Sequence, residues 1–280
     1  MTIFLAEHSG YCYGVKRAIK MLDGLVDLNV PVFTYGPIIH NQQVTDYYKQ
    51  KGVNVIDDLE AFEHFGREIA ILVIRSHGAP KAIYDIAEEL GFEIRDATCP
   101  YVKKIQNTVS TYALKGYNII IVGDSAHPEV IGINGWCNNS AVIVNTIEDV
   151  DLLQGISGPV CVVAQTTYKI RLWECITERL QNKYENCHIH NTICLATEQR
   201  QTACVEMAQK VELMIVIGGK HSSNTVKLAQ LCSQIVKTIH IETKDDLDES
   251  QFKGNEIIGI TAGASTPDWI IESVILKIEK

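Results

Sequence analysis

The sequence predicts an α/β fold with three similar parallel-sheet domains in a pseudo-threefold arrangement around a central cavity. Two observations lead to this prediction. Apolar runs of strand length alternate with helical patterns along the chain, which is typical of parallel strands joined by right-handed crossover helices. In addition, three cysteines share one spacing to a polar residue further along the chain, which indicates an internal threefold repeat.

Short apolar runs predict strands, four in each repeat. The first repeat contains 2–5, 32–35, 53–56 and 69–74, the second contains 92–95, 118–122, 141–144 and 160–164, and the third contains 188–192, 213–217, 238–241 and 257–261. The run 118–122 is continuously apolar, as expected for a strand that is buried on both faces. The third strand of each repeat ends in no chemically notable residue, so we expect it at an edge of its sheet.

Helical patterns lie between most of these strands. One example is the set Val15, Ala18, Ile19, Leu22 and Leu25. These residues recur three or four positions apart, which indicates one apolar helix face. Further helical patterns occupy 82–90, 102–114, 170–180 and 226–235, and another begins at 130. The predicted domains span 13–98, 99–193 and 194–280.

The repeat places polar residues at the ends of predicted strands. Each of three cysteines precedes a polar residue by 28 positions, and the pairs are Cys12 with His40, Cys99 with His127, and Cys194 with Ser222. The end of the fourth strand adds one more polar residue to each repeat, namely His77, Thr166 and Ser265. Ligands of open α/β sheets bind beyond the carboxyl ends of the strands. We therefore expect the three sets to face one cavity.

The three repeated cysteines are candidate metal ligands. Three converging thiolates could hold a zinc ion or three corners of a cubane iron–sulfur cluster. Each cysteine lies just before a helical pattern, and a helix N-terminus favours a negatively charged ligand group. With no fourth cysteine in the repeat, one iron would lack a protein thiolate. The alternative is that a cysteine is a small buried apolar residue, and this is our interpretation of the six that fall outside the register: Cys137, Cys161, Cys175, Cys187, Cys204 and Cys232.

Neutral and weakly basic donors gather at the same strand ends and suit a phosphate or diphosphate. They are His40, His77, His127, Thr166, Ser222, Ser223, Asn224 and Ser265. The alternative for Ser222, Ser223, Asn224 and also Asn41 is helix capping, and the two roles are compatible. Glu129 follows His127 by two residues, which makes it the best candidate for a proton donor. Without that neighbour, it would be an ordinary glutamate in the first turn of a helix.

Composition excludes several other classes of function. The net charge of −9 and the pI of about 5.5 argue against a basic nucleic-acid-binding surface. No apolar run approaches the ~20 residues of a membrane helix, and no signal peptide is evident. Nine cysteines, an odd number, are expected to be thiols or metal ligands in a reducing cytoplasm. No dinucleotide or P-loop motif is present, so a redox reaction would need electrons from a separate carrier protein.

Nine motifs in order along nearly the whole chain resemble the 4-hydroxy-3-methylbut-2-enyl diphosphate reductase family. They are GYCYGV (10–15), IHN (39–41), RSHG (75–78), DATCP (96–100), GDSAHPEV (123–130), QTT (165–167), NTICLAT (191–197), GGKHSSN (218–224) and TAGAS (261–265). The resemblance implies three α/β domains around a cavity, with the strand in 1–12 completing the third sheet. From composition we expect a cytoplasmic protein that binds neither nucleic acid nor membranes.

The resemblance implies one [4Fe–4S] cluster held by Cys12, Cys99 and Cys194, with one iron that lacks a protein thiolate and takes the substrate hydroxyl. The eight donors above would line the site and largely hold the small-molecule allylic diphosphate, while Glu129 delivers protons. Two electrons from an external carrier of the ferredoxin or flavodoxin type, with two protons, remove the hydroxyl as water. The products would be isopentenyl and dimethylallyl diphosphate, in the last step of non-mevalonate isoprenoid synthesis.

The sequence departs from the family pattern beside its ligands. Tyr13 takes a position that is usually small, and His221 and Thr225 replace an asparagine and a serine of the later motif. These changes leave the ligands intact but alter their surroundings, which tune cluster potential and donor preference. The family's site threonine corresponds to Thr166 or to Thr167. Two other functions use the same ligands without net reduction, an open-iron dehydratase or a zinc hydrolase, and a third is a non-enzymatic anion-binding or structural metal protein.

Overall fold

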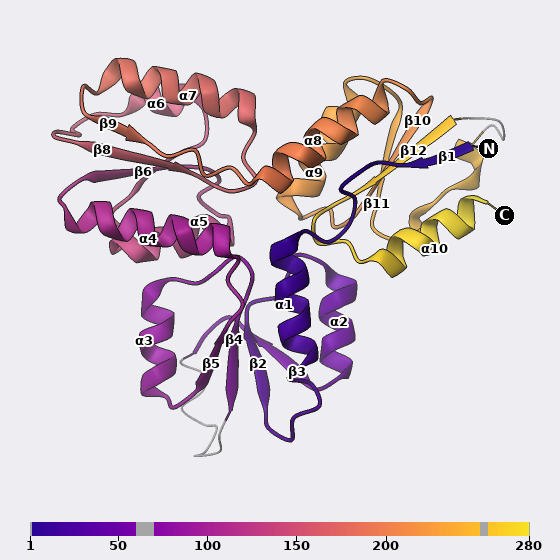
Figure 1. Cartoon of the computed structure of the whole chain (residues 1–280), viewed down its shortest axis with the longest axis horizontal. Helices are drawn as coiled ribbons and strands as arrows, with labels where there is room; N and C mark the ends of the chain where they lie inside the picture. Colours follow the sequence, from indigo (N-terminus) through magenta and orange to yellow (C-terminus); the bar gives the residue numbers. More distant parts are fainter. Residues whose placement is uncertain (1, 60–69, 253–256, 280) are drawn as a thin grey trace. The chain divides into compact units, whose positions relative to one another are not determined.

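Three four-stranded parallel sheets and the helices around them make up the fold (Figure 1). The computed structural model of the chain describes residues 2–59, 70–252 and 257–279. One sheet has the order β1 (Thr2–Leu5), β12 (Ile257–Ala262), β10 (Leu213–Ile217) and β11 (Thr238–Ile241). The second has the order β3 (Val53–Ile56), β2 (Val32–Tyr35), β4 (Ile71–Ile74) and β5 (Glu93–Asp96). The third has the order β7 (Val142–Val144), β6 (Asn118–Val122), β8 (Val160–Ala164) and β9 (Cys187–Ile189).

The helices follow the strands in alternation. They are α1 (Tyr13–Asp23), α2 (Gln42–Gln50), α3 (Lys81–Glu89), α4 (Pro100–Leu114), α5 (Pro128–Asn134), α6 (Ile147–Leu152), α7 (Ile170–Lys183), α8 (Leu195–Ala208), α9 (Ser223–Ser233) and α10 (Asp268–Ile278). Short 3₁₀ turns are η2 (Gly135–Cys137), η3 (Lys244–Asp246) and η4 (Glu249–Gln251). Across 2–59, 70–252 and 257–279, no helix has the length and apolarity needed to cross a bilayer.

The predicted α/β class with three parallel sheets is confirmed. Each predicted strand is present, with ends that differ by at most a few residues, although the start of the run 69–74 lies outside the described residues. The third strand of each repeat, β3, β7 or β11, is at a sheet edge, as expected. The first strand of each repeat pairs with the last strand of the preceding repeat, so β1 pairs with β12 and completes the third sheet. The domain boundaries and the arrangement around a cavity stay predictions.

The chain divides into two compact units. One contains 1–16, 39–46 and 195–280, and with them the sheet β1-β12-β10-β11. The other contains 17–38 and 47–194, and with them the two remaining sheets. Each unit is described on its own below.

The central strands are buried on both faces because helices cover both sides. In β6, Ile120 and Val122 pack into a core with Trp173 of α7, whereas Ile119 and Ile121 pack into another with Ile105 of α4. Figure 1 shows α6 and α7 on one side of this sheet and α4 and α5 on the other. Because helices cover both faces of the sheet, the sequences of these strands are continuously apolar rather than alternating between apolar and polar residues. In β4, β6, β8 and β10, polar residues are therefore confined to the strand ends and the loops beyond them, where the candidate site lies.

Candidate functional site

Each repeated cysteine is tied by its backbone to the loop beyond a neighbouring strand. Its N–H donates to the carbonyl oxygen of the second residue past that strand, and the pairs are Cys99 with Ser76 at 2.9 Å, Cys194 with Thr166 at 2.9 Å, and Cys12 with Ala264 at 3.2 Å. In each case the strand that precedes the cysteine pairs with the strand that precedes the carbonyl. The repeat seen in the sequence is thus repeated in the hydrogen bonding.

Each of these cysteines also stands immediately before a helix. Tyr13 begins α1, Pro100 begins α4 and Leu195 begins α8. Cys99 is the N-cap of α4, but its side chain makes no capping hydrogen bond, and Pro100 occupies the first turn. The three thiols are partly exposed and none forms a disulfide. Partly exposed thiols at helix starts suit thiolate ligation, because the N-terminal peptide dipoles favour negative charge.

The other six cysteines differ from this set in their surroundings. Cys137, Cys161, Cys204 and Cys232 are buried, and burial raises the pKa of the Cys161 thiol to about 12. Burial also raises the pKa of Cys187, which is half-buried. For Cys161 and Cys187, burial thus disfavours the thiolate form. The prediction that Cys175 belongs to the core is wrong, because it lies on the solvent side of α7 and is exposed.

His127 and Glu129 form the start of α5. His127 is the N-cap, and its Nδ1 accepts a hydrogen bond from the Glu129 N–H at 3.1 Å. An accepting Nδ1 carries no proton, so the proton of the neutral imidazole sits on Nε2. The cap therefore fixes the tautomer and leaves Nε2–H as a donor that can serve an anionic oxygen.

Thr166 holds both oxygens of the Glu129 carboxylate. The Thr166 N–H donates to Oε1 at 2.6 Å, and the Thr166 hydroxyl donates to Oε2 at 2.7 Å. Glu129 is 2% exposed and Thr166 is 7% exposed. The neighbouring Thr167 instead accepts a hydrogen bond from the Gln165 amide at 3.2 Å. Of the two threonines left open by the sequence, Thr166 is thus the one that contacts Glu129.

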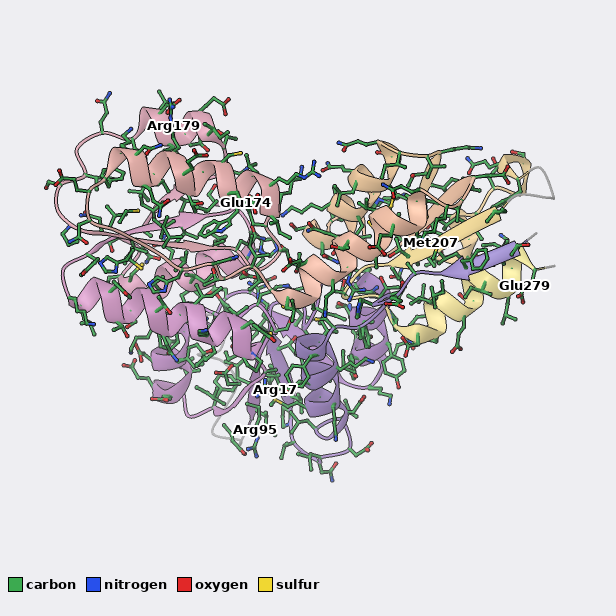
Figure 2. All side chains as sticks on the ribbon, turned by 45° about the horizontal axis from the view of Figure 1, so that its top comes forward. Arg17, Arg95, Glu174, Arg179, Met207 and Glu279 are labelled. Atoms are coloured by element: carbon green, nitrogen blue, oxygen red, sulfur yellow. The ribbon has the colours of Figure 1, made fainter. Side chains whose placement is uncertain are left out.

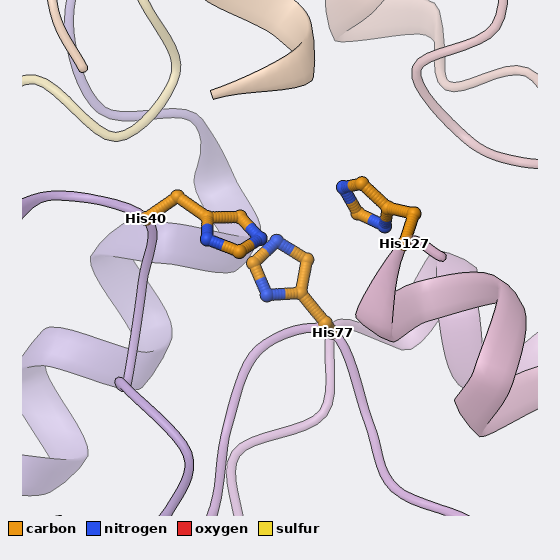
Figure 3. Close-up of side chains that lie close together, drawn as sticks. All are labelled: His40, His77 and His127. Carbon is orange, nitrogen blue, oxygen red and sulfur yellow. The ribbon is translucent and has the colours of Figure 1, made fainter. Parts of the chain in front are cut away.

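His77 lies on the loop beyond β4 and faces His127. Their rings are 5.5 Å apart between centroids and nearly perpendicular, at 84° (Figure 3). The following residue, Gly78, has a φ of +75°, a conformation that glycine adopts without strain. This turn directs the chain from the buried strand to α3 while His77 stays beside the start of α5. Two imidazoles, Glu129 and Thr166 therefore belong to one group, with Cys99 and Cys194 on the adjoining loops.

The other six predicted site residues lie in the compact unit that contains 1–16, 39–46 and 195–280, and they are Cys12, His40, Ser222, Ser223, Asn224 and Ser265. The Ser265 hydroxyl donates to the His40 carbonyl at 3.0 Å, which ties the loop beyond β12 to the residue before α2. Asn224 is 5% exposed, and its amide nitrogen has no hydrogen-bond partner among the described residues. A buried N–H group of this kind is a donor that a bound anion would satisfy.

Capping explains part of this group. Ser222 is the N-cap of α9 and accepts from the Thr225 N–H at 3.4 Å, and Asn41 accepts from the Val44 N–H at 3.0 Å at the start of α2. Ser223 and Asn224 are not caps, because they are the first two residues of α9 itself. The capping alternative therefore holds for Ser222 and Asn41 only.

Two acidic residues within the motifs, Asp96 and Asp124, have structural roles. Asp124 accepts a hydrogen bond from the Ala126 N–H at 2.9 Å, which closes a turn before His127. Asp96 accepts from the Thr98 N–H at 2.9 Å and from Lys103 Nζ at 2.9 Å. Burial alone would raise the pKa of Asp96, but the hydrogen bonds from Thr98 and Lys103 outweigh it and lower that pKa.

Sequence reasoning did not single out Gln106, which packs against the loop that carries His77. Gln106 comes from α4, is fully buried, and has no hydrogen-bond partner for either amide atom among the described residues. A Cβ at Gly78 would lie 2.4 Å from its Nε2. The only signal in the sequence is a polar residue at a position where the apolar pattern of α4 continues on both sides.

Comparisons with known proteins agree over the whole chain. A family model described as "LytB protein" matches residues 3–279. A relative from Clostridioides difficile, described as 4-hydroxy-3-methylbut-2-enyl diphosphate reductase, is 46% identical over 281 residues, covering 100% of this chain and 99% of the relative. A relative of the same description from Caldanaerobacter subterraneus is 49% identical over 284 residues, covering 100% and 97%.

Two solved structures are similar as well. One is described as (E)-4-hydroxy-3-methyl-but-2-enyl diphosphate reductase, the terminal enzyme of the non-mevalonate pathway. It has a TM-score of 0.72 and 37% identity, and the match covers 100% of this chain and 99% of that one. The other is the corresponding reductase from Plasmodium falciparum, with a TM-score of 0.92 and 30% identity over 100% and 88% of the two chains.

Proposed function

Because the chain belongs to the LytB protein family, we propose that it reduces 4-hydroxy-3-methylbut-2-enyl diphosphate, the reaction for which its relatives are named. The substrate takes up two electrons and two protons and loses its hydroxyl group as water, giving isopentenyl and dimethylallyl diphosphate. The observation that carries the proposal is the repeated arrangement of Cys12, Cys99 and Cys194, each before a helix and each with the same backbone hydrogen bond.

One [4Fe–4S] cluster fits these three cysteines, with one iron that lacks a protein thiolate. The chemistry of the donor set supports it, because these thiols are partly exposed at helix starts while four of the others are buried. When bound, the cluster supplies single electrons and a Lewis-acidic iron. The chain contributes fixed ligand positions, because each backbone hydrogen bond anchors a cysteine to a strand-end loop.

The diphosphate would be held by neutral donors rather than by lysines or arginines. His127 offers Nε2–H, since its Nδ1 is occupied by the Glu129 N–H, and Asn224 offers a buried amide nitrogen. The remaining donors are His40, His77, Thr166, Ser222, Ser223 and Ser265. The starts of α5 and α9 add peptide dipoles that favour negative charge.

Glu129 would supply a proton to the departing oxygen, because hydroxide is a poor leaving group. Thr166 holds the carboxyl group by both oxygens, which fixes its orientation. The same clamp keeps the group in place after it has given up its proton, because a carboxylate accepts both hydrogen bonds. The carboxyl group is nearly inaccessible to water, so exchange with bulk solvent would pass through neighbouring groups rather than directly.

The electrons would come from an external carrier of the ferredoxin or flavodoxin type. No dinucleotide-binding motif accompanies the site, and the substrate accepts two electrons that a cluster passes on one at a time. A cytoplasmic location, expected from the unpaired cysteines, is part of the proposal.

Turnover by anaerobically purified protein tests the proposal. We expect a brown, iron-containing protein that oxidises reduced methyl viologen only when the allylic diphosphate is present, with two electrons consumed for each substrate molecule. Water loss without consumption of reductant would favour a dehydratase. A colourless, zinc-containing protein that releases phosphate would favour a hydrolase, and diphosphate binding without turnover would favour an anion-binding protein.

A further inference from the structure

An open groove of about 690 Å³ runs along α4 beside Cys99. Thr98 and Pro100, the two neighbours of Cys99 in the chain, form part of its wall. The charged and titratable residues of the groove are Arg17, Asp96, Lys103, Lys104 and His190. All of them belong to the same compact unit as Cys99. The groove therefore lies next to a proposed cluster ligand but is formed by residues that have no part in the site described above.

The groove is positively charged, although the chain as a whole carries −9. Asp96 is the only carboxylate among the described residues that line it, and Lys103 neutralises it at 2.9 Å. Burial, together with the charges of His188 and Lys104, lowers the pKa of His190, so this imidazole is neutral at pH 7. Arg17 and Lys104 remain as two positive charges without a carboxylate partner among the described residues.

Arg17 connects the groove to the chain around Cys99. Its guanidinium donates to the Thr98 carbonyl at 3.1 Å and to the Asp96 carbonyl at 3.1 Å. Carbonyl oxygens fix the side chain without cancelling its charge, so Arg17 stays cationic next to the residue that precedes Cys99. Figure 2 labels Arg17 on α1.

The opposite wall is an exposed stripe of α4. Lys104, Asn107 and Thr111 are exposed and recur at helical spacing, so they share one face over roughly 10 Å of helix. A stripe of separate polar side chains on an open groove suits the surface of a protein better than a small anion, which needs several donors converging on one point. Tyr112 at the end of the groove adds an aromatic contact of the kind enriched in interfaces.

We propose that this groove is the docking surface for an acidic one-electron carrier protein. The inference rests on the proposed function, which requires two electrons for each substrate. Two reduced carriers dock in turn, each gives up one electron and leaves oxidised, and the two electrons with two protons convert the allylic alcohol to the alkene and water. Charge complementarity guides the encounter, and the position beside Cys99 keeps the path from carrier to cluster short.

Charge reversal on α4 tests the docking surface with a bacterial ferredoxin as the probe. The variant is Lys104→Glu, and the matched control is Arg179→Glu, which makes the same change of charge at an exposed site on α7 (Figure 2). Helix α7 covers the opposite face of the same sheet from α4. Arg179 pairs with the exposed Asp151, and an exposed ion pair contributes little to stability, so its loss has little effect on the fold.

We expect Lys104→Glu to raise the Kd for ferredoxin by about fivefold or more at low ionic strength, and the difference to shrink in ~0.5 M NaCl. Arg179→Glu should change the Kd by less than about twofold. Binding is measured by calorimetry with the cluster-loaded protein. A second readout is the ratio of ferredoxin-driven to dithionite-driven turnover, which should fall in Lys104→Glu only.

An unchanged Kd in Lys104→Glu, or an equal rise in both variants, overturns the docking proposal. A second outcome also overturns the docking proposal. If ferredoxin shows no salt-dependent binding and the groove instead binds inorganic diphosphate at millimolar concentration, the groove is a site for a small anion. Failure of the proposed function has a different signature. Dithionite-driven turnover would then be absent from the unmodified protein, whereas ferredoxin binding would still be measurable.

Discussion

Glu129 is buried, and both of its carboxylate oxygens accept hydrogen bonds from Thr166. We predict that Glu129→Gln keeps the cluster and binds the diphosphate with little loss but lowers turnover by ~10²–10⁴-fold, the usual contribution of a general acid. Glutamine keeps the shape and can still accept from the Thr166 N–H, while the Thr166 hydroxyl can turn to accept from the new amide. Turnover, iron content and substrate affinity are the measurements.

Glu148→Gln is the matched control for Glu129→Gln. Glu148 is also a glutamate in the first turn of a helix, α6, but it is exposed. Its substitution should leave turnover unchanged. Near-normal turnover in Glu129→Gln, with the iron content intact, would show that the proton comes from another group such as His127.

Asp96 links the chain before Cys99 to α4, and its pKa lies below the ordinary value because the hydrogen bonds from Thr98 and Lys103 outweigh burial. A carboxyl group whose pKa is lower in the folded state contributes stability that is fully present above its unfolded pKa of about 3.9. This contribution is lost as the pH falls through the folded value. We therefore predict that the free energy of unfolding falls below about pH 4, and less steeply in Asp96→Asn. Urea unfolding between pH 3 and 6 measures both slopes, and parallel curves would contradict the assignment.

Helix starts in this protein are of two kinds. At α6, the Thr146 side chain and Asp149 form a capping box that satisfies the first N–H groups. At α4, Cys99 occupies the N-cap position without a capping hydrogen bond from its side chain. The first turn of α4 therefore keeps N–H groups that no cap side chain engages. These N–H groups favour negative charge at the Cys99 sulfur.

The loop between β4 and α3 packs tightly against α4 at Gly78, whose φ is +75°. An added Cβ would lie 2.4 Å from Gln106 Nε2 and 3.2 Å from Thr98 Cγ2. We predict that Gly78→Ala lowers the free energy of unfolding by about 2–4 kcal/mol, the sum of left-handed backbone strain and a forced shift of a buried side chain. It should also weaken substrate binding, because His77 precedes this turn.

Gly116→Ala separates the two contributions to the Gly78 effect. Gly116 has a similar φ of +79°, but a Cβ there would meet nothing within 4 Å. Its substitution should cost only the backbone strain, about 1 kcal/mol. Equal losses in the two variants, measured by urea unfolding, would mean that the contact with Gln106 contributes nothing.

The complete chain holds nine cysteines, of which three recur in register. We predict that changing Cys12, Cys99 or Cys194 to Ser lowers the iron content, whereas Cys161→Ala and Cys175→Ala leave it unchanged. Cys161 is buried in a strand, and its raised pKa disfavours a thiolate. Cys175 is exposed on α7 and does not share the 28-residue spacing of the three repeated cysteines. Iron per polypeptide after anaerobic purification is the measurement, and equal loss in both sets would contradict the ligand assignment.

Local patterns were sufficient for the strands but not for all helices. The central strands β4, β6, β8 and β10 are buried apolar runs, so their positions follow from composition within five or six residues. Helix α8 was missed because its buried stripe includes the polar residues Thr197 and Arg200, so no apolar periodicity shows in the sequence. Helix α10 was missed because it is apolar nearly all round. Pairing was predicted less well, because the strand that opens each repeat joins the sheet of the preceding repeat, and only the resemblance indicated this for β1.

The spacing of residues along the chain was enough to identify the three cysteines, the strand ends and Glu129 as candidates, because a repeated unit places equivalent residues at equal intervals. Tertiary structure alone decided which of these groups touch. Thr166 clamps Glu129 across 37 residues of sequence, and Arg17 reaches the carbonyl before Cys99 across 81. Such contacts depend on how the crossover helices pack against the sheets and on the turns at strand ends. No local pattern encodes those distances, because they result from packing the entire chain at once.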